Sequence, residues 1–197
     1  PEIKAMELNI FIICIQVIFT ISSASSADFK LFSSSPIGPY HMVFKQVYIC
    51  NPEHHYKIRT NWHLSHGDNK TMLIGNTTLE VPFDDNLSLE LKMAYKASSG
   101  SWRENAFMHT ALNACTSIKL LLGSVWTTFV NGFGIQNTNC PILPGSYISP
   151  GVNPSIFEKS NFAKELMYGT YKLHFIFNSR KNEIFGCIVF IVEIKRR

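Results

Sequence analysis

Short runs of β-branched and aromatic residues, separated by turn-forming residues, make up much of the chain between residues 43 and 95. They fall at 43–50, 56–64, 71–74, 78–81 and 87–95, with an apparent turn at Gly75 and Asn76. In the last run, apolar residues at 87, 89, 91, 93 and 95 alternate with polar ones, which is typical of a strand with one buried face. Regularly spaced strands of this kind favour an antiparallel sandwich or an open barrel.

The pattern changes to a helical period after this region. Between Thr110 and Val130, apolar side chains recur at steps of three and four residues, which predicts one amphipathic helix with Leu112, Trp126 and Phe129 on its buried stripe. Gly123 weakens the middle of this helix, so a shorter helix is an alternative.

A stretch without a clear period follows from residue 132 to residue 168. It contains four prolines but is rich in aromatic and aliphatic residues, which indicates an ordered functional loop. A hairpin then comes at the end, with strands at 169–178 and 184–194, and the second strand is apolar on both faces, as expected inside a fold. The fold class predicted is mainly β: an Ig-like two-sheet antiparallel sandwich with one amphipathic helix and a long apolar rim loop.

The N-terminal region is typical of a secretory signal peptide. The uncharged run Leu8–Ile21 is too short to cross a bilayer, and small residues at 22–27 follow it. We expect Met6 to be the initiator, cleavage after Ala27, and one domain from 28 to 197. A buried strand or a membrane anchor is the alternative for this segment.

In a secreted chain, cysteines are expected to form disulfides and Asn-X-Ser/Thr sequons can carry glycans. Cys50, Cys115, Cys140 and Cys187 predict two disulfides, for which three connectivities are possible. The sequons fall in sequences that resemble turns, and we expect a glycan on at least one of their asparagines, Asn69, Asn76 and Asn86.

The amino-acid composition argues against a disordered chain and against a nucleic-acid-binding protein. With 46% hydrophobic residues, 13% aromatic residues and a formal charge of +4, the chain is too apolar to be disordered and lacks a long basic stripe for nucleic acid. The basic end, residues 195–197, is interpreted as a solvated strand terminus, with contact to an anionic lipid surface as the alternative.

Motifs for catalysis and for metal binding are missing from the sequence. There is no nucleophile elbow, zinc-protease motif, P-loop or dinucleotide fingerprint. His54, His55, His63 and His66 are interpreted as exposed residues rather than metal ligands. The Asp84-Asp85 pair is interpreted as a solvated turn. We therefore predict a protein that is not an enzyme and that needs no metal or cofactor.

Several short motifs together resemble the ganglioside-activator-like branch of the ML lipid-recognition superfamily, in particular its divergent secreted arthropod members. The resemblance covers about residues 45–195. Its most specific part is Cys115 followed by Asn139-Cys-Pro-Ile142 and Pro144-Gly-Ser-Tyr147. The other parts are Trp102, residues 119–126, Phe133-Gly134, residues 168–172 and Gly186-Cys-Ile188.

This resemblance implies a β-cup, in which two antiparallel sheets splay apart over an apolar cavity with a helix and loops at the rim. It implies a non-enzymatic protein that takes an acyl-chain lipid from a membrane and carries it. It also implies the pairs Cys50–Cys187 and Cys115–Cys140. The chain has fewer cysteines than the vertebrate ganglioside activator, and some relatives are associated with contact chemosensation.

The candidate binding residues follow from strand alternation and from the apolar loop. We expect a cavity wall built by Leu89, Leu91, Met93, Phe175 and Phe177. We expect a rim formed by Phe133, Tyr147, Phe157 and Phe162. The predicted function is lipid binding and transfer by a secreted protein, with the lysosome as the alternative location, transient contact with a membrane, and a protein partner whose identity is unknown.

The alternative is a secreted recognition module, of a chemosensory, receptor-binding or enzyme-partner type, with a filled core. The size of the cavity separates the two hypotheses. A lipid site calls for an apolar void of several hundred Å³.

Overall fold

Eight strands form two antiparallel sheets in the residues that the computed structural model describes, which are 40–67, 70–162 and 167–197. The predicted signal peptide, its cleavage point and Asn69 lie outside these residues. The larger sheet has the order β1 (Tyr40–Ile49), β8 (Ile184–Arg196), β7 (Gly169–Asn178), β4 (Ser88–Lys96) and β5 (Trp102–Ala111). The smaller sheet has the order β2 (Ile58–Gly67), β3 (Lys70–Leu79) and β6 (Gly145–Val152). The mainly β, two-sheet fold class predicted from the alternation is confirmed.

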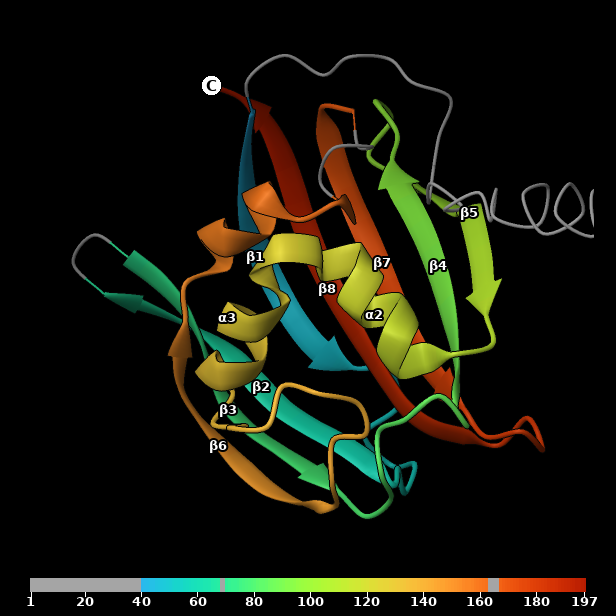
Figure 1. Cartoon of the computed structure of the whole chain (residues 1–197). Helices are drawn as coiled ribbons and strands as arrows, with labels where there is room; N and C mark the ends of the chain where they lie inside the picture. The colour runs from blue at the N-terminus through green and yellow to red at the C-terminus, as the bar shows by residue number, and fades with distance from the viewer. Residues whose placement is uncertain (1–39, 68–69, 163–166) are drawn as a thin grey trace, which may run out of the picture. The chain divides into compact units, whose positions relative to one another are not determined.

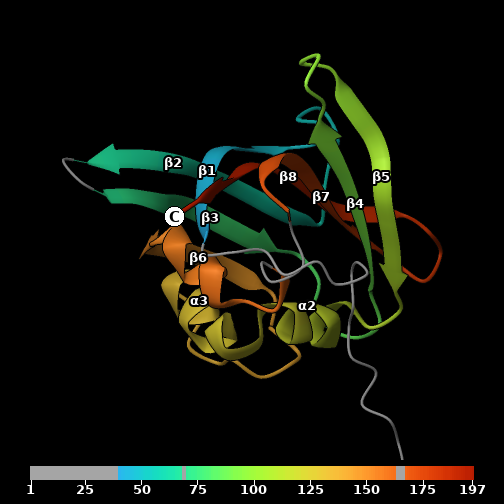
Figure 2. The ribbon, with the colours of Figure 1, turned by 90° about the horizontal axis from the view of Figure 1, so that it is seen from above.

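The helical elements lie beside the two sheets. They are α2 (Ala114–Leu122), the 3-10 turn η1 (Gly123–Val125) and α3 (Trp126–Gly132), and a second 3-10 segment, η2 (Pro154–Lys159), follows β6. Figures 1 and 2 show α2 and α3 together on one side of the sheets, with η2 next to them. The inner faces of both sheets and the buried faces of α2 and α3 contribute to one apolar core. No helix among the described residues has the length and the apolar character needed to cross a bilayer.

The predicted turn at Gly75 and Asn76 is wrong, because both residues lie inside the single strand β3. Gly75 has φ +140°, and a Cβ at this position would lie 1.9 Å from the Asn61 carbonyl oxygen. The register between β3 and β6 also shifts between Leu73 and Gly75. The glycine therefore marks a bulge and a close approach of two backbones in a continuous strand.

The predicted helix is present, but it begins later than expected and is interrupted. Thr110 and Ala111 belong to β5, and Leu112 is 80% exposed instead of lying on the buried stripe. Gly123 has φ +58° and separates α2 from α3 through η1. Strand β5 escaped prediction because it is an edge strand, and most of its side chains are exposed and follow no apolar alternation.

Asp85 has a more specific role than that of a solvated turn residue. Its Oδ1 accepts a hydrogen bond from the Thr116 backbone N–H at 2.8 Å, and its Oδ2 accepts one from the Thr116 hydroxyl at 2.6 Å. A carboxylate that accepts from an N–H in the first turn of a helix stabilises that turn. Asp85 thus fixes the start of α2 against the loop between β3 and β4.

The region predicted as one long apolar loop contains two regular elements. Strand β6 pairs with β3 along the edge of the smaller sheet, and η2 begins at Pro154, where Asn153 Oδ1 accepts from the Ser155 backbone N–H at 3.0 Å. The strand lacked a recognisable period because Pro150 and Gly151 interrupt its alternation. The rest of the described part of this region is mostly loop, and it carries apolar side chains into the core.

Two disulfides connect distant parts of the domain. The Cα atoms of Cys50 and Cys187 lie 5.5 Å apart, and this bridge joins the end of β1 to β8. The Cα atoms of Cys115 and Cys140 lie 6.1 Å apart, and this bridge joins α2 to the loop that leads to β6. These are the two pairs that the family resemblance implies.

Candidate functional site

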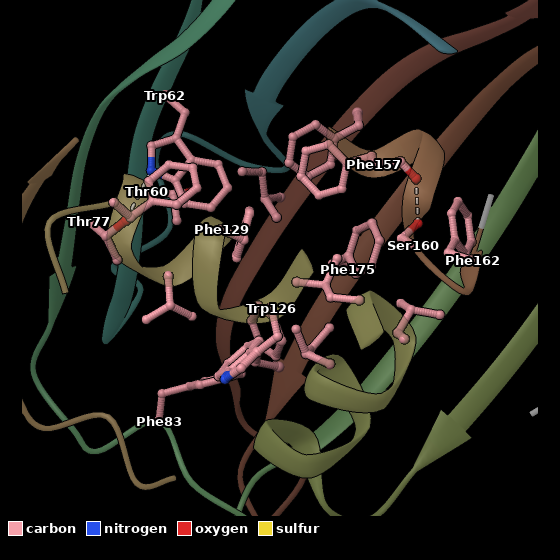
Figure 3. Close-up of a pocket in the computed structure, with 18 of the residues that line it drawn as sticks. Thr60, Trp62, Thr77, Phe83, Trp126, Phe129, Phe157, Ser160, Phe162 and Phe175 are labelled. Carbon is pink, nitrogen blue, oxygen red and sulfur yellow. Dashed lines mark hydrogen bonds between the residues drawn. The ribbon is translucent and has the colours of Figure 1, made fainter. Parts of the chain in front are cut away.

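An apolar cavity of about 160 Å³ lies in the core, with walls from both sheets, from α2 and α3, and from η2. No polar atom is exposed to this cavity. Aromatic side chains form a large part of the wall, as Figure 3 shows for several of them. They are Phe44, Trp62, Phe83, Trp126, Phe129, Phe133, Phe157, Phe162, Phe175, Phe177 and Phe190.

These rings form a connected series that joins the smaller sheet to the larger one. Trp62 of β2 stacks on Phe133 with a centroid distance of 4.2 Å, and Phe133 contacts Phe129 of α3 at 4.7 Å. Phe129 contacts Phe157 of η2 at 5.5 Å, and Phe157 contacts Phe44 of β1 at 5.2 Å. Aromatic pairs at such separations add about 0.5–1.5 kcal/mol each beyond the burial of their area. The series therefore holds the walls in place around a space that side chains leave unfilled.

Four side chains in the wall that carry a polar atom, those of Trp62, Thr77, Trp126 and Ser160, use it in hydrogen bonds to the protein itself. The Trp62 Nε1–H donates to Thr77 Oγ1 at 2.9 Å, and the Ser160 hydroxyl donates to the Phe157 carbonyl oxygen at 2.6 Å. The Trp126 Nε1–H donates to the Thr138 carbonyl oxygen at 2.7 Å. The surface of the cavity is therefore apolar, and an apolar cavity accepts hydrocarbon in preference to water.

The structure brings five of the nine predicted binding residues to the cavity. Phe175 and Phe177 belong to its wall, as expected from their alternation on β7. Phe133, Phe157 and Phe162 also line it, although Phe133 and Phe162 are buried, at 2% and 6% exposure, rather than placed at an open rim. Phe157 is half-buried.

The other four predicted residues lie elsewhere. Leu89, Leu91 and Met93 are buried on the inner face of β4, directly opposite the wall residues Phe177, Phe175 and Leu173 of β7, but they do not themselves line the cavity. Tyr147 lies on β6, where its hydroxyl donates to the Leu143 carbonyl oxygen at 2.7 Å. Alternation correctly predicted that the β4 residues are buried. It could not predict where they lie relative to the smaller sheet and the helices on the other side of the core.

Sequence reasoning missed Trp62, Thr60 and Thr77 of the smaller sheet as candidate site residues. The alternation of Ile58, Thr60, Trp62 and Leu64 along β2 was the available signal for one inward face. Threonine at two inner positions weakened that signal. Among the described residues, no three His, Cys, Asp or Glu side chains gather as a metal site would require.

Segment η2 is attached to β1 by Glu158. The Met42 backbone N–H donates to Glu158 Oε1 at 2.9 Å, and His41 Nδ1 lies 3.4 Å from the same oxygen. The Tyr40 hydroxyl donates to the Glu158 carbonyl oxygen at 2.7 Å, and Arg197 Nη2 lies 3.8 Å from Glu158 Oε2. Burial and the Glu158 carboxylate both raise the pKa of Tyr40 above its ordinary value. These contacts hold Phe157, the neighbour of Glu158, against the cavity.

His174, on the polar face of the larger sheet, lies in surroundings that disfavour its protonated, positively charged form. Burial lowers the pKa of His174 on β7, and the nearby Lys172 and Lys92 lower it further, while Glu104 opposes them. Burial likewise raises the pKa of Tyr171 on the inner face of the same strand. Both shifts follow from packing in the sheet and not from the cavity wall.

The predicted glycosylation positions and basic end are placed as follows. Asn86 is exposed in a turn, where Arg180 Nη2 donates to its Oδ1 at 2.7 Å. Asn76 is exposed on strand β3 instead of in a turn. The four histidines at 54, 55, 63 and 66 are exposed. Lys195 Nζ lies 3.3 Å from Glu193 Oε2, so the basic end is partly paired with acidic groups.

The fold and the site together define a two-sheet β-sandwich with an apolar cavity lined largely by aromatic rings. Searches of protein-family models and of curated proteins found no match. Among solved structures, the chain is similar to the crystal structure of chicken MD-1 complexed with lipid IVa, with 12% sequence identity and a TM-score of 0.36. That match covers 79% of this chain and 97% of the MD-1 chain. A likeness at this level is too distant to assign a family or a ligand.

Proposed function

We propose that this protein binds a lipid, without enzymatic activity, by inserting a hydrocarbon segment into the cavity between its sheets. The observation that carries the proposal is the cavity itself, which is lined largely by aromatic rings and exposes no polar atom. Burying a methylene group is worth about 0.8 kcal/mol, so even a short inserted segment contributes several kcal/mol before the costs of binding. The sequence motifs that resemble the ML superfamily, its ganglioside-activator-like branch in particular, support the same function.

The volume of the cavity sets the mode of binding that we propose. A cavity of about 150 Å³ is known to hold a ring as large as benzene, so about 160 Å³ accepts a segment of that size. Pockets for drug-sized ligands are about 300–1,000 Å³. A longer acyl chain therefore needs Phe157 and η2 to move outward, which makes this segment the proposed gate.

The two disulfides are what we expect of a protein in an oxidising compartment. We propose that the protein is secreted, or directed to the lysosome, and glycosylated. A role in lipid transfer adds transient contact with a membrane, from which the hydrocarbon segment enters.

The second candidate function is that of a secreted recognition module with a filled core. The specific observation in its favour is that the cavity is smaller than the several hundred Å³ expected for a lipid site. In that case an exposed surface, rather than the cavity, binds the partner.

Two neighbouring leucines on α2 provide a matched test. Leu121 lines the cavity and is 3% exposed, whereas Leu120 is 62% exposed. Leu121→Trp puts a large ring into the cavity, with an overpacking cost of about 1–3 kcal/mol, while Leu120→Trp makes the same change on the outer face. Each variant is secreted from cells, analysed by native mass spectrometry, and extracted to identify any bound lipid.

We expect bound lipid on the native protein and on Leu120→Trp, and much less on Leu121→Trp. Thermal unfolding establishes that both variants are folded. A native protein that carries no lipid and takes up none from vesicles contradicts the proposal and favours the recognition module.

A further inference from the structure

The Trp62–Thr77 hydrogen bond lies across the two strands of the smaller sheet that face the cavity. Trp62 is opposite Gly75 in the β2–β3 register, and Thr77 lies two residues further along β3, opposite Thr60. This places Trp62 and Thr77 as diagonal neighbours on one sheet face, within reach of a long aromatic side chain. Figure 3 shows both side chains at one end of the cavity.

The bond determines which hydrogen-bonding groups a ligand meets. An indole N–H is a donor only, and the Thr77 hydroxyl accepts it while 7% exposed. As no polar atom is exposed to the cavity, the Thr77 oxygen does not face an inserted ligand although the residue lines the wall. The indole of Trp62 therefore covers a polar group that lies directly behind the wall.

We propose that Trp62 is a specificity-determining residue that restricts the cavity to unsubstituted hydrocarbon ends and rejects chain ends that carry a hydroxyl group. This inference rests on the proposed lipid-binding function and narrows its ligand class. The ligand inserts a terminal methyl group or an unsubstituted ring, and its polar group stays outside the cavity.

The physical reason is the cost of burying a polar group without a partner. A hydroxyl at the inserted end leaves water and finds no donor or acceptor in the wall, which disfavours binding. An apolar pocket discriminates against an added hydroxyl by about 100-fold. Trp62→Phe removes the indole N–H together with the larger ring that covers Thr77, so the Thr77 hydroxyl faces the ligand with its own O–H as donor and the released lone pair as acceptor.

The test compares dodecanoic acid with 12-hydroxydodecanoic acid, which differ only at the end that enters the cavity. Dissociation constants are measured by titration calorimetry for the native protein and for Trp62→Phe, Trp62→Phe/Thr77→Val and Trp126→Phe. The last variant is the matched control, because Trp126 also lines the cavity but donates to the carbonyl oxygen of Thr138, a residue outside the wall.

We expect the native protein to bind the hydroxy acid about 100-fold more weakly than the unsubstituted acid. Trp62→Phe should reduce this ratio to about tenfold or less, because Thr77 becomes available as a partner. The double variant should restore the native ratio, and Trp126→Phe should leave it unchanged. Any general gain in cavity volume alters both affinities together and leaves the ratio as it was.

Each result separates the inference from the proposed function. If neither acid binds the native protein, the lipid-binding proposal fails, and the inference fails with it. If both bind the native protein equally, or if Trp62→Phe keeps the native ratio, lipid binding stands and the role of Trp62 is overturned. Should Trp62→Phe not fold, Trp62→Leu, which also lacks the indole N–H, takes its place with the same expected ratio.

Discussion

The Cys50–Cys187 bridge should stabilise the fold more than the Cys115–Cys140 bridge. The perturbations are two double variants, Cys50→Ala/Cys187→Ala and Cys115→Ala/Cys140→Ala, each of which removes one bridge without adding a polar side chain. Cys187 and Cys115 are both buried, at 7% and 0% exposure, so the loss of packing is similar in the two variants. The main difference between them is the length of chain that each bridge closes.

The sequence separations are 137 residues for Cys50–Cys187 and 25 residues for Cys115–Cys140. In the chain-entropy account, a bridge destabilises the unfolded state by an amount that grows with the logarithm of the loop length. The long loop gives about 5 kcal/mol and the short loop about 3.5 kcal/mol at 25 °C. The difference of about 1.5 kcal/mol corresponds to about a tenfold difference in the unfolding equilibrium constant.

Urea unfolding followed by circular dichroism measures the free energy of unfolding of each variant and of the native protein. The native protein with both bridges reduced is the control, because it should be less stable than either variant. Equal losses in the two variants, or a larger loss without Cys115–Cys140, refute the argument from loop length.

Three further results are expected. Phe175→Ala should lower the free energy of unfolding by about 3–5 kcal/mol in a urea titration, because it enlarges a cavity beside the rings of Phe190 and Phe162; a loss below 1 kcal/mol would show that the site collapses. Glu158→Ala should accelerate release of a bound fluorescent fatty acid several-fold in stopped-flow measurements, since it removes the side-chain contacts of η2 with Met42 and His41 of β1, and an unchanged rate would show that η2 is not the gate. Because the pKa of His174 is lowered in the folded state, the native protein should lose stability as the pH falls below about 6.5, where the unfolded chain takes up a proton first; His174→Asn should flatten this part of the stability curve, and an equally steep curve contradicts the assignment.

Much of the strand arrangement could be predicted from side-chain alternation, because alternation reports which face of a strand is buried. It identified the strands that became β4 and β7, while runs of β-branched and aromatic residues between turns identified β1 and β2, and a run that is apolar on both faces identified β8. Alternation failed at β5 because an exposed edge strand has no buried face to report. It also failed at Gly75, because a glycine that permits a bulge has the same sequence signature as one that forms a turn.

The candidate site could be predicted only in part, because its walls come from separate layers. Phe175 was assigned to the cavity from one strand, but the same reasoning assigned Leu91, which packs beside Phe175 on the neighbouring strand and does not line the cavity. The distinction depends on which strand of the larger sheet faces β2 and β3, and that is a property of the layer packing. The partnership of Trp62 with Thr77 depends on the β2–β3 register, which the predicted turn at Gly75 had hidden.

The position of β8 has a consequence for the order of events during synthesis. This strand is the last of the described strands to leave the ribosome, yet it lies between β1 and β7 in the larger sheet. Until it emerges, β1, the first of the described strands to be made, lacks the strand that it pairs with in the larger sheet, and its apolar inner residues Met42 and Phe44 stay uncovered. Pairing between segments so far apart is slow, and exposed strand edges invite aggregation. A growing chain in which β8 has not yet emerged therefore exposes an unpaired edge of β1 beside apolar side chains, the combination that favours aggregation.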